Sequence, residues 1–219
     1  MDVFSIIGPV MIGPSSSHTA GAVRIGNVAG SLLGEEIASA DILFVGSFAK
    51  TYRGHGTDKA VIAGILGMAP SDSRIKTSLE YAKKKGVQFQ FRTGEMDGVH
   101  PNTMQITLTG KQGKKVEVLG SSIGGGNIVI KKINGYAINV LGQSTTLLVF
   151  HRDIPGMISD VTRLLAIHDI NINRFSLQRD KKGGIAVMAI EIDGKIPDNV
   201  VEEVKHVHNV TEVVLLKMD

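Results

Sequence analysis

The stretch TTLLVFHRDIPG, residues 145–156, joins a run of β-branched and large apolar residues to a turn that contains Asp153, Pro155 and Gly156. Such a run is typical of a strand. Asp153 is a residue type that caps helices, and Pro155 suits a first helical turn. Apolar residues then recur at helical spacing up to about His168, namely Ile158, Val161, Leu164 and Leu165. We therefore predict a strand followed directly by an amphipathic helix.

Two more strands are predicted downstream, at 171–180 and 185–193, and the KKGG between them indicates a hairpin. A short amphipathic helix is expected after Pro197, and VTEVVLLKM at 210–218 is expected to be the last strand. The resulting order is βαββαβ. This is the ferredoxin-like arrangement, in which two helices cover one face of an antiparallel sheet.

The polar stretch Gly142-Gln143-Ser144 indicates a hinge, so we predict one domain over 1–142 and a second over 145–219. The first domain is predicted to be a mixed α+β domain whose topology the periodicity does not fix. We expect helices after Pro14, at 56–68 and at 74–85, and strands at 40–49, 87–92, 103–109, 115–119, 127–133 and 135–140. In the first helix, Ala22, Gly26 and Gly30 are spaced four apart, which predicts a face that another element approaches very closely.

Composition narrows the function classes. The 219 residues include no cysteine, which excludes disulfides, thiolate catalysis and any cluster or zinc held by this chain's own sulfurs. No apolar run reaches eighteen residues, and the first residues do not resemble a secretory signal, so we expect a cytoplasmic protein without a membrane helix. The net charge is +3, and the short lysine groups lack the interleaved aromatics of a nucleic-acid surface.

Three of the seven histidines have similar surroundings. His18, His55 and His100 occur in SSSHT, RGHGTD and GVHPNT, each with glycine or proline nearby and a Thr, Asn or Asp just after. Loops at element ends are where substrate-handling residues usually lie. We therefore expect these three histidines to be candidate site residues, whereas His151, His168, His206 and His208 have ordinary structural explanations.

The serines of GPSSSHTAG, residues 13–21, are expected at a helix N-terminus. There the hydroxyls and free backbone N–H groups can bind a carboxylate or phosphate. A plain N-cap needs only one serine, and a nucleophilic serine beside His18 is less favoured because adjacent helical residues do not face each other. The glycines at 124–126 can either present amides to an anion or form an ordinary turn.

These motifs resemble the β chain of bacterial iron–sulfur-dependent L-serine dehydratases (L-serine ammonia-lyases). GPSSSHTAG is the most specific element, and RGHGTD at 53–58, HPNT at 100–103 and GGGN at 124–127 follow in the order of that family. The second half resembles an ACT domain, with DIPG at 153–156 as its loop and NIN at 171–173 at its second strand. The resemblance covers essentially the whole chain.

The resemblance implies removal of ammonia from L-serine to leave pyruvate, with a 4Fe–4S cluster as Lewis acid. Because this chain has no cysteine, the cluster's ligands must lie on a partner α chain, so we expect a heteromer and no activity from this chain alone. The implied site residues are His18, His55 and His100 for catalysis and Ser15, Ser16, Ser17, Thr19 and Asn102 for substrate binding, with no metal ligand on this chain.

For the ACT half, the resemblance implies an amino-acid effector, of which L-serine is one candidate, across a dimer of such domains, near Asp153, Gly156, Asn171 and Ile172. The first half is also similar to the allosteric substrate-binding domain of some phosphoglycerate dehydrogenases. A regulatory amino-acid sensor with no catalytic role is therefore the alternative. A serine hydrolase built on Ser17 and His18 is a third, less favoured reading.

Overall fold

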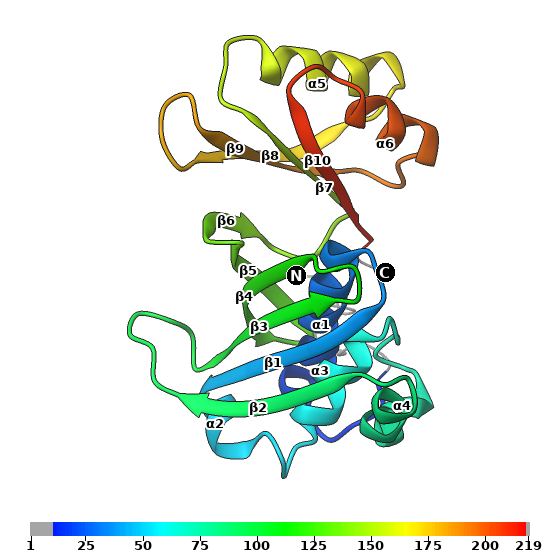
Figure 1. The fold of residues 1–219 in the computed structure, drawn as a ribbon, viewed down its shortest axis with the longest axis vertical. Coiled ribbons are helices and arrows are strands. Elements are labelled where there is room, and N and C mark those ends of the chain that lie inside the picture. The colour runs from blue at the N-terminus through cyan, green and yellow to red at the C-terminus, as the bar shows by residue number, and fades with distance from the viewer. Residues whose placement is uncertain (1–10, 218–219) are drawn as a thin grey trace. The chain divides into compact units, whose positions relative to one another are not determined.

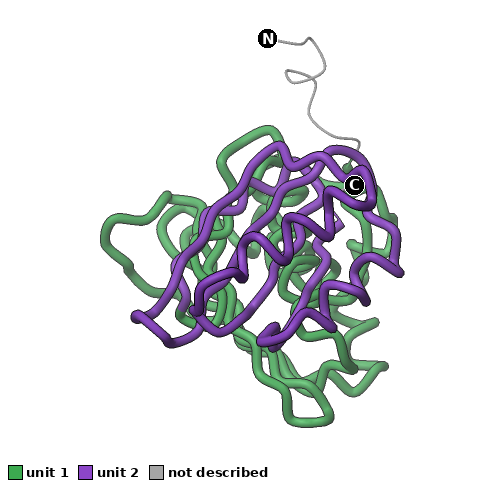
Figure 2. Tube along the Cα trace, turned by 90° about the horizontal axis from the view of Figure 1, so that it is seen from above, with its two compact units in different colours: residues 1–135 green, residues 136–219 purple. Residues whose placement is uncertain are grey.

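The computed structural model describes residues 11–217 and divides into two compact units, with the division after Gly135 (Figure 2). No helix in this range is both long and apolar enough to cross a membrane. The described residues form two sheets.

The first helix that the structure describes changes its pitch along its length. Ser16–Ala20 form a π-helical turn, η2, which continues without a break into α1 (Gly21–Leu33). Ser15 is the N-cap, because its hydroxyl accepts a hydrogen bond from the backbone N–H of His18. The helix predicted after Pro14 is confirmed, and π-helical turns of this kind are frequent at functional sites.

The first unit's sheet contains β1 (Ile37–Gly46), β2 (Gln88–Gly94), β3 (Asn102–Gly110), β4 (Lys115–Gly124) and β5 (Asn127–Ile133), in the order β2-β1-β3-β4-β5. Strand β2 is parallel to β1, and the other neighbours are antiparallel. Helix α1 packs on one face of this sheet, against β3, β4 and β5, and α3 (Thr57–Ile65) packs against α1 (Figure 1).

The predicted small-residue face of α1 is confirmed, and its partner is α3. A Cβ on Gly26 would lie 2.5 Å from the carbonyl oxygen of Val61, and one on Gly30 would lie 2.7 Å from that of Ile65. From the other side, a Cβ on Gly64 would overlap the carbonyl oxygen of Val23. The two helix backbones are therefore in direct contact, which only glycine permits.

Several element boundaries differ from the predictions. The strand expected at 115–119 continues to Gly124, and the helix expected at 56–68 ends at Ile65. The strand expected over 40–49 ends at Gly46, and helix α2 (Ser47–Thr51) begins there. Gly46 has φ 61°, and a Cβ on it would lie 2.5 Å from the carbonyl oxygen of Pro101, so the chain turns where another loop meets it. The helix expected over 74–85 consists of a 3₁₀ turn, η3 (Ser73–Thr77), followed by α4 (Ser78–Lys84).

The second unit has the predicted βαββαβ order. Its elements are β7 (Thr146–Arg152), α5 (Met157–Ile167), β8 (Ile172–Arg179), β9 (Ile185–Ile192), α6 (Asp198–Lys205) and β10 (Val210–Leu216), with the sheet order β10-β7-β9-β8. Apolar residues of α5 and α6 share one core with those of β7 and β9. Strand β6 (Tyr136–Val140) precedes this order and contacts β8 and β9, and the domain boundary at 142–145 stays a prediction.

The start of α5 differs from the prediction. Its N-cap is Gly156, with φ 95° and no side-chain cap, and Pro155 lies before the helix. Asp153 does not cap it, because its carboxylate accepts hydrogen bonds from Arg179 Nη1 at 2.9 Å and from the Gly183 backbone N–H at 3.1 Å. These partners lie beyond the helix, on β8 and on the hairpin that follows it.

Candidate active site

The π-helical turn before α1 positions His18 in the interior of the first unit. Its imidazole is buried, and its Nδ1 lies 3.3 Å from Ser15 Oγ. The neighbouring Ser16 and Ser17 are half-buried in the same turn. Because Ser15 rather than Ser17 is within hydrogen-bonding distance of the imidazole, the geometry gives no support to a nucleophilic pair of Ser17 and His18.

His55 lies beside His18, as expected for a shared site. It belongs to the connection between α2 and α3, where its backbone N–H donates to the Thr51 carbonyl at 3.0 Å. The two imidazole rings meet edge to face, with their centroids 4.6 Å apart. Phe48 contacts the His18 ring at 5.1 Å between centroids. Two of the three predicted histidines are thus in direct contact.

Ser47 connects His18 to the HPNT loop. The sequence does not indicate this role, because the strand predicted over 40–49 includes Ser47. Its Oγ lies 3.5 Å from His18 Nε2, and its backbone N–H donates to the Pro101 carbonyl at 2.7 Å. Asn102 is paired with Gly46 in the register of β1 and β3. His100 Nδ1 accepts from the Asn102 backbone N–H at 3.1 Å, and the His100 side chain is exposed. His100 therefore reaches the cluster through this loop rather than by touching His18.

Several buried polar atoms around this cluster have no hydrogen-bond partner. In the described part of the first unit they include Thr19 Oγ1, His55 Nδ1, Thr57 Oγ1, Asn102 Oδ1 and Ser122 Oγ. Buried polar atoms are normally satisfied, because leaving one unpaired costs about 1–3 kcal/mol. Such a concentration near one histidine pair indicates a place where a polar ligand can supply the missing partners.

Electrostatics keep His18 neutral. Burial, followed by the neighbouring His55, lowers the pKa of His18 below its ordinary value of 6.5. At neutral pH the imidazole is therefore unprotonated and able to accept a proton. In the same region, burial raises the pKa of the Asp58 carboxyl, at the start of α3.

This lowered pKa predicts the acid limb of the pH profile. If neutral His18 acts as a catalytic base, kcat/KM for the reaction it serves stays high as the pH falls through 6.5 and drops only at the lowered pKa. In His55→Gln the repulsion from a second imidazole is gone, so the His18 pKa rises and the limb moves to higher pH. Rates measured from pH 5 to 8 for both proteins check this, and an identical acid limb would contradict it.

The chain does not fit an iron–sulfur cluster. It has no cysteine, and the residues that the structure describes contain no group of three or more His, Asp or Glu that could hold a metal ion. Iron–sulfur clusters are held by cysteine thiolates, and this chain has none to offer.

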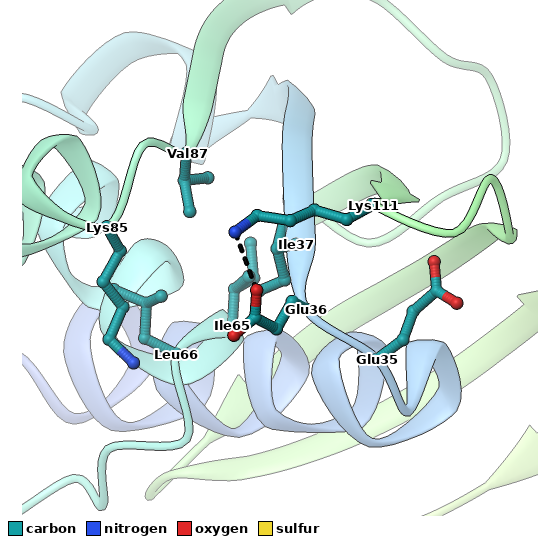
Figure 3. A pocket seen from close by; sticks show the side chains of 8 residues that line it. All are labelled: Glu35, Glu36, Ile37, Ile65, Leu66, Lys85, Val87 and Lys111. Atoms are coloured by element: carbon teal, nitrogen blue, oxygen red, sulfur yellow. Dashed lines mark hydrogen bonds and ion pairs between the residues drawn. The ribbon is translucent and has the colours of Figure 1, made fainter.

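A separate cavity of about 400 Å³ lies near the other end of α1 (Figure 3). It is lined by Glu35, Glu36, Ile37, Ile65, Leu66, Lys85, Val87 and Lys111. Lys111 Nζ is paired with Glu36 Oε2 at 2.7 Å, as the dashed line in Figure 3 marks. None of the predicted site residues lines it, so it is distinct from the His18 cluster.

The four predicted effector residues fall into two separate pairs. Strands β7 and β8 both pair antiparallel with β9, so they run in the same direction. Asp153 and Gly156 follow the end of β7, where Arg179 also ends β8, whereas Asn171 and Ile172 lie at the beginning of β8. The length of β8, roughly 25 Å, separates the pairs. One unit therefore does not bring the four residues together.

Polar side chains lie close to each pair of predicted effector residues. Asn171 Nδ2 donates to Asp193 Oδ2 at 2.7 Å, and this bond lowers the Asp193 pKa. Next to Asp153, His151 is almost fully buried, and its Nδ1 lies 2.7 Å from the Arg152 carbonyl oxygen. Its Nε2 has no partner. The sequence predicts a purely structural role for His151, and it does not indicate a buried Nε2 without a partner.

Comparison with known proteins gives matches to both units. The family model described as "Serine dehydratase beta chain" matches residues 1–133, and the ACT domain model matches residues 145–209. The chain is 46% identical to the "Probable L-serine dehydratase, beta chain" of Bacillus subtilis, over 96% of each chain. It is 42% identical to the "L-serine dehydratase, beta chain" of Peptoniphilus asaccharolyticus, over 90% of this chain and 89% of that one. A "D-3-phosphoglycerate dehydrogenase" of Synechocystis is 25% identical over 90% of this chain and 36% of its own length.

Proposed function

The chain belongs to the serine dehydratase beta chain family, and we propose that it is the β subunit of an L-serine dehydratase that converts L-serine to pyruvate and ammonia. The observation that carries this proposal is the cluster of buried, neutral His18 with Ser15, Ser47 and His55. A base kept neutral by burial is what removal of a weakly acidic Cα–H requires.

In this proposal the first turn of the helix holds the substrate. The hydroxyls of Ser15, Ser16, Ser17 and Thr19 and the backbone N–H groups of the turn donate hydrogen bonds to its carboxylate, which suits the positive end of a helix. Asn102 Oδ1, buried and without a partner, accepts from the ammonium group. His18 takes the Cα proton, with His55 and the more exposed His100 orienting or relaying it.

The remaining chemistry belongs to a partner. Two relatives are named beta chains, which implies an α chain. We infer that the α chain holds the cysteine ligands of a 4Fe–4S cluster, because this chain has no cysteine to offer. The catalytic unit is then a heteromer with the site at the boundary of the two chains, and this chain alone is inactive.

The second unit is proposed to bind an amino-acid effector, for which L-serine is one candidate. Because Asp153 and Asn171 lie at opposite ends of β8, a complete site needs two copies. Strand β8 is at the edge of its sheet. Antiparallel pairing of β8 with β8 of a second copy brings Asp153 and Gly156 of one unit beside Asn171 and Ile172 of the other. The free acceptor of His151 then lies close to the ligand.

A purely regulatory sensor remains the second candidate. It is favoured by the ACT unit and by the similarity to a phosphoglycerate dehydrogenase over 90% of this chain. In that case the His18 cluster is a ligand pocket without chemistry.

Anaerobic turnover of L-serine separates the two functions. Pyruvate formation is measured with this chain alone, with the reconstituted α chain alone and with the mixture. The subunit proposal expects activity only in the mixture, and loss of that activity after exposure to oxygen. Full activity from the α chain alone, merely adjusted by this chain, would support the sensor instead.

A further inference from the structure

Arg24, in the first part of α1, has a guanidinium group that the residues described by the structure do not fully satisfy. Its Nη1 donates to the Gly126 carbonyl at 3.0 Å, and its Nε is buried with no hydrogen-bond partner. Across residues 11–217 no carboxylate forms an ion pair with it. A guanidinium is always charged and has five N–H donors, so one backbone carbonyl leaves most of its binding capacity unused.

The turn that holds this guanidinium consists of three glycines. Gly124, Gly125 and Gly126 have φ values of 100°, 60° and 79°, which residues with a Cβ rarely adopt. A Cβ on Gly124 would meet no atom within 4 Å, so conformation rather than crowding calls for glycine there. The turn therefore presents bare backbone beside the guanidinium, and the Gly126 carbonyl fixes the direction in which the guanidinium points.

This turn lies at the same end of the first unit as His18. Strand β4 leads into it, and Ser121 of β4 pairs with Thr103, next to Asn102 of the predicted site. A Cβ on Gly21, at the start of α1, would overlap Ser122 Oγ, whose hydroxyl is buried without a partner. Because helical side chains lean toward the helix N-terminus, the Arg24 side chain extends from its own turn toward this end.

We propose that Arg24 binds a carboxylate that this chain does not itself provide, with the Gly124–Gly126 turn as the support that aims it. The carboxylate belongs either to the substrate or to an acidic side chain of the α chain, and both offer the planar, bidentate partner that guanidinium prefers. The inference rests on the proposed function for its assembled enzyme and adds a residue outside the SSSHT, RGHGTD and HPNT motifs.

The test compares Arg24→Gln with the wild-type chain in two measurements. Steady-state turnover with the α chain gives KM and kcat for L-serine, and titration of the α chain with this chain gives the Kd of assembly, which needs no turnover. Loss of a hydrogen-bonded charge is expected to raise one of these constants by about 10-fold to 100-fold. A rise in KM with kcat nearly unchanged identifies the substrate carboxylate, and a rise in Kd identifies the partner's carboxylate.

The matched control is Arg74→Gln, whose exposed guanidinium is already paired with Asp72 and should change neither constant. If Arg24→Gln has a lower Tm, Arg24→Lys is measured in its place. Lysine keeps the charge and a donor for the Gly126 carbonyl but cannot form a bidentate pair with a carboxylate, so the same constant is expected to rise. A role in holding the glycine turn alone would lower Tm and leave KM and Kd as they are, and that result would overturn the proposal. Absence of turnover in the wild-type mixture would count against the proposed function, while the Kd measurement would still decide the role of Arg24.

Discussion

Replacement of His18 by glutamine is expected to lower kcat of the assembled enzyme by about 100-fold to 10,000-fold, the usual contribution of a general base. Glutamine has a similar size and can still bond to Ser15 and Ser47, but it cannot take up a proton at neutral pH. The variant therefore lacks the neutral base that burial provides in the wild-type chain. Anaerobic pyruvate formation with saturating L-serine measures the effect.

His208→Gln is the matched control for this substitution. His208 is exposed in the second unit, so kcat should remain at the wild-type value. Assembly with the α chain is measured for both variants, so that a lost subunit contact is not read as lost chemistry. Equal kcat for His18→Gln and wild type, with normal assembly, would remove His18 from the catalytic machinery.

Gly64→Ala is expected to destabilise the first unit, although it adds only one methyl group. Alanine normally stabilises a helix by up to about 1 kcal/mol relative to glycine. Here the added Cβ overlaps the Val23 carbonyl, so α1 and α3 must move apart. Overpacking of this kind lowers the free energy of unfolding by about 1–3 kcal/mol. Urea unfolding of the isolated chain measures it.

The control for this prediction is Gly54→Ala. Gly54 has no positive φ, and a Cβ on it would lie 3.8 Å from its nearest neighbour, the Thr51 carbonyl oxygen. Its free energy of unfolding should stay close to that of the wild type. A Gly64→Ala chain that is as stable as the control would show that the two helices can separate at little cost.

Much of the architecture was predictable because local patterns determine it. In the second unit, alternation and helical spacing gave the βαββαβ order, and the hairpin after β8 was expected from its Lys-Lys-Gly-Gly sequence. The spacing of Gly26 and Gly30 predicted a close approach, although only the structure identifies α3 as the partner.

The parts that failed depend on contacts between distant residues. The turn at Gly46 exists because Pro101 lies against it, so a strand pattern across 40–49 could not reveal α2 or Ser47. Asp153 is a residue type that often caps helices. Its carboxylate instead accepts hydrogen bonds from Arg179 and Gly183. Such contacts are a property of the folded chain and leave no local signal.

The sequence was enough to predict which histidines belong to the candidate site, but not how they are arranged in it. Similar loop surroundings singled out His18 and His55, which the structure places in contact. The same surroundings gave His100, which is exposed and joins the cluster only through Pro101 and Ser47. The catalytic roles of all three stay predictions.

The central claim is that this chain completes the active site of a two-chain dehydratase. Anaerobic pyruvate formation by the α chain alone, by the α chain with this chain and by the α chain with the His18→Gln chain tests it most directly. We expect turnover only in the mixture with the wild-type chain. Equal turnover in all three would contradict it, because the His18 cluster would then play no part in the reaction.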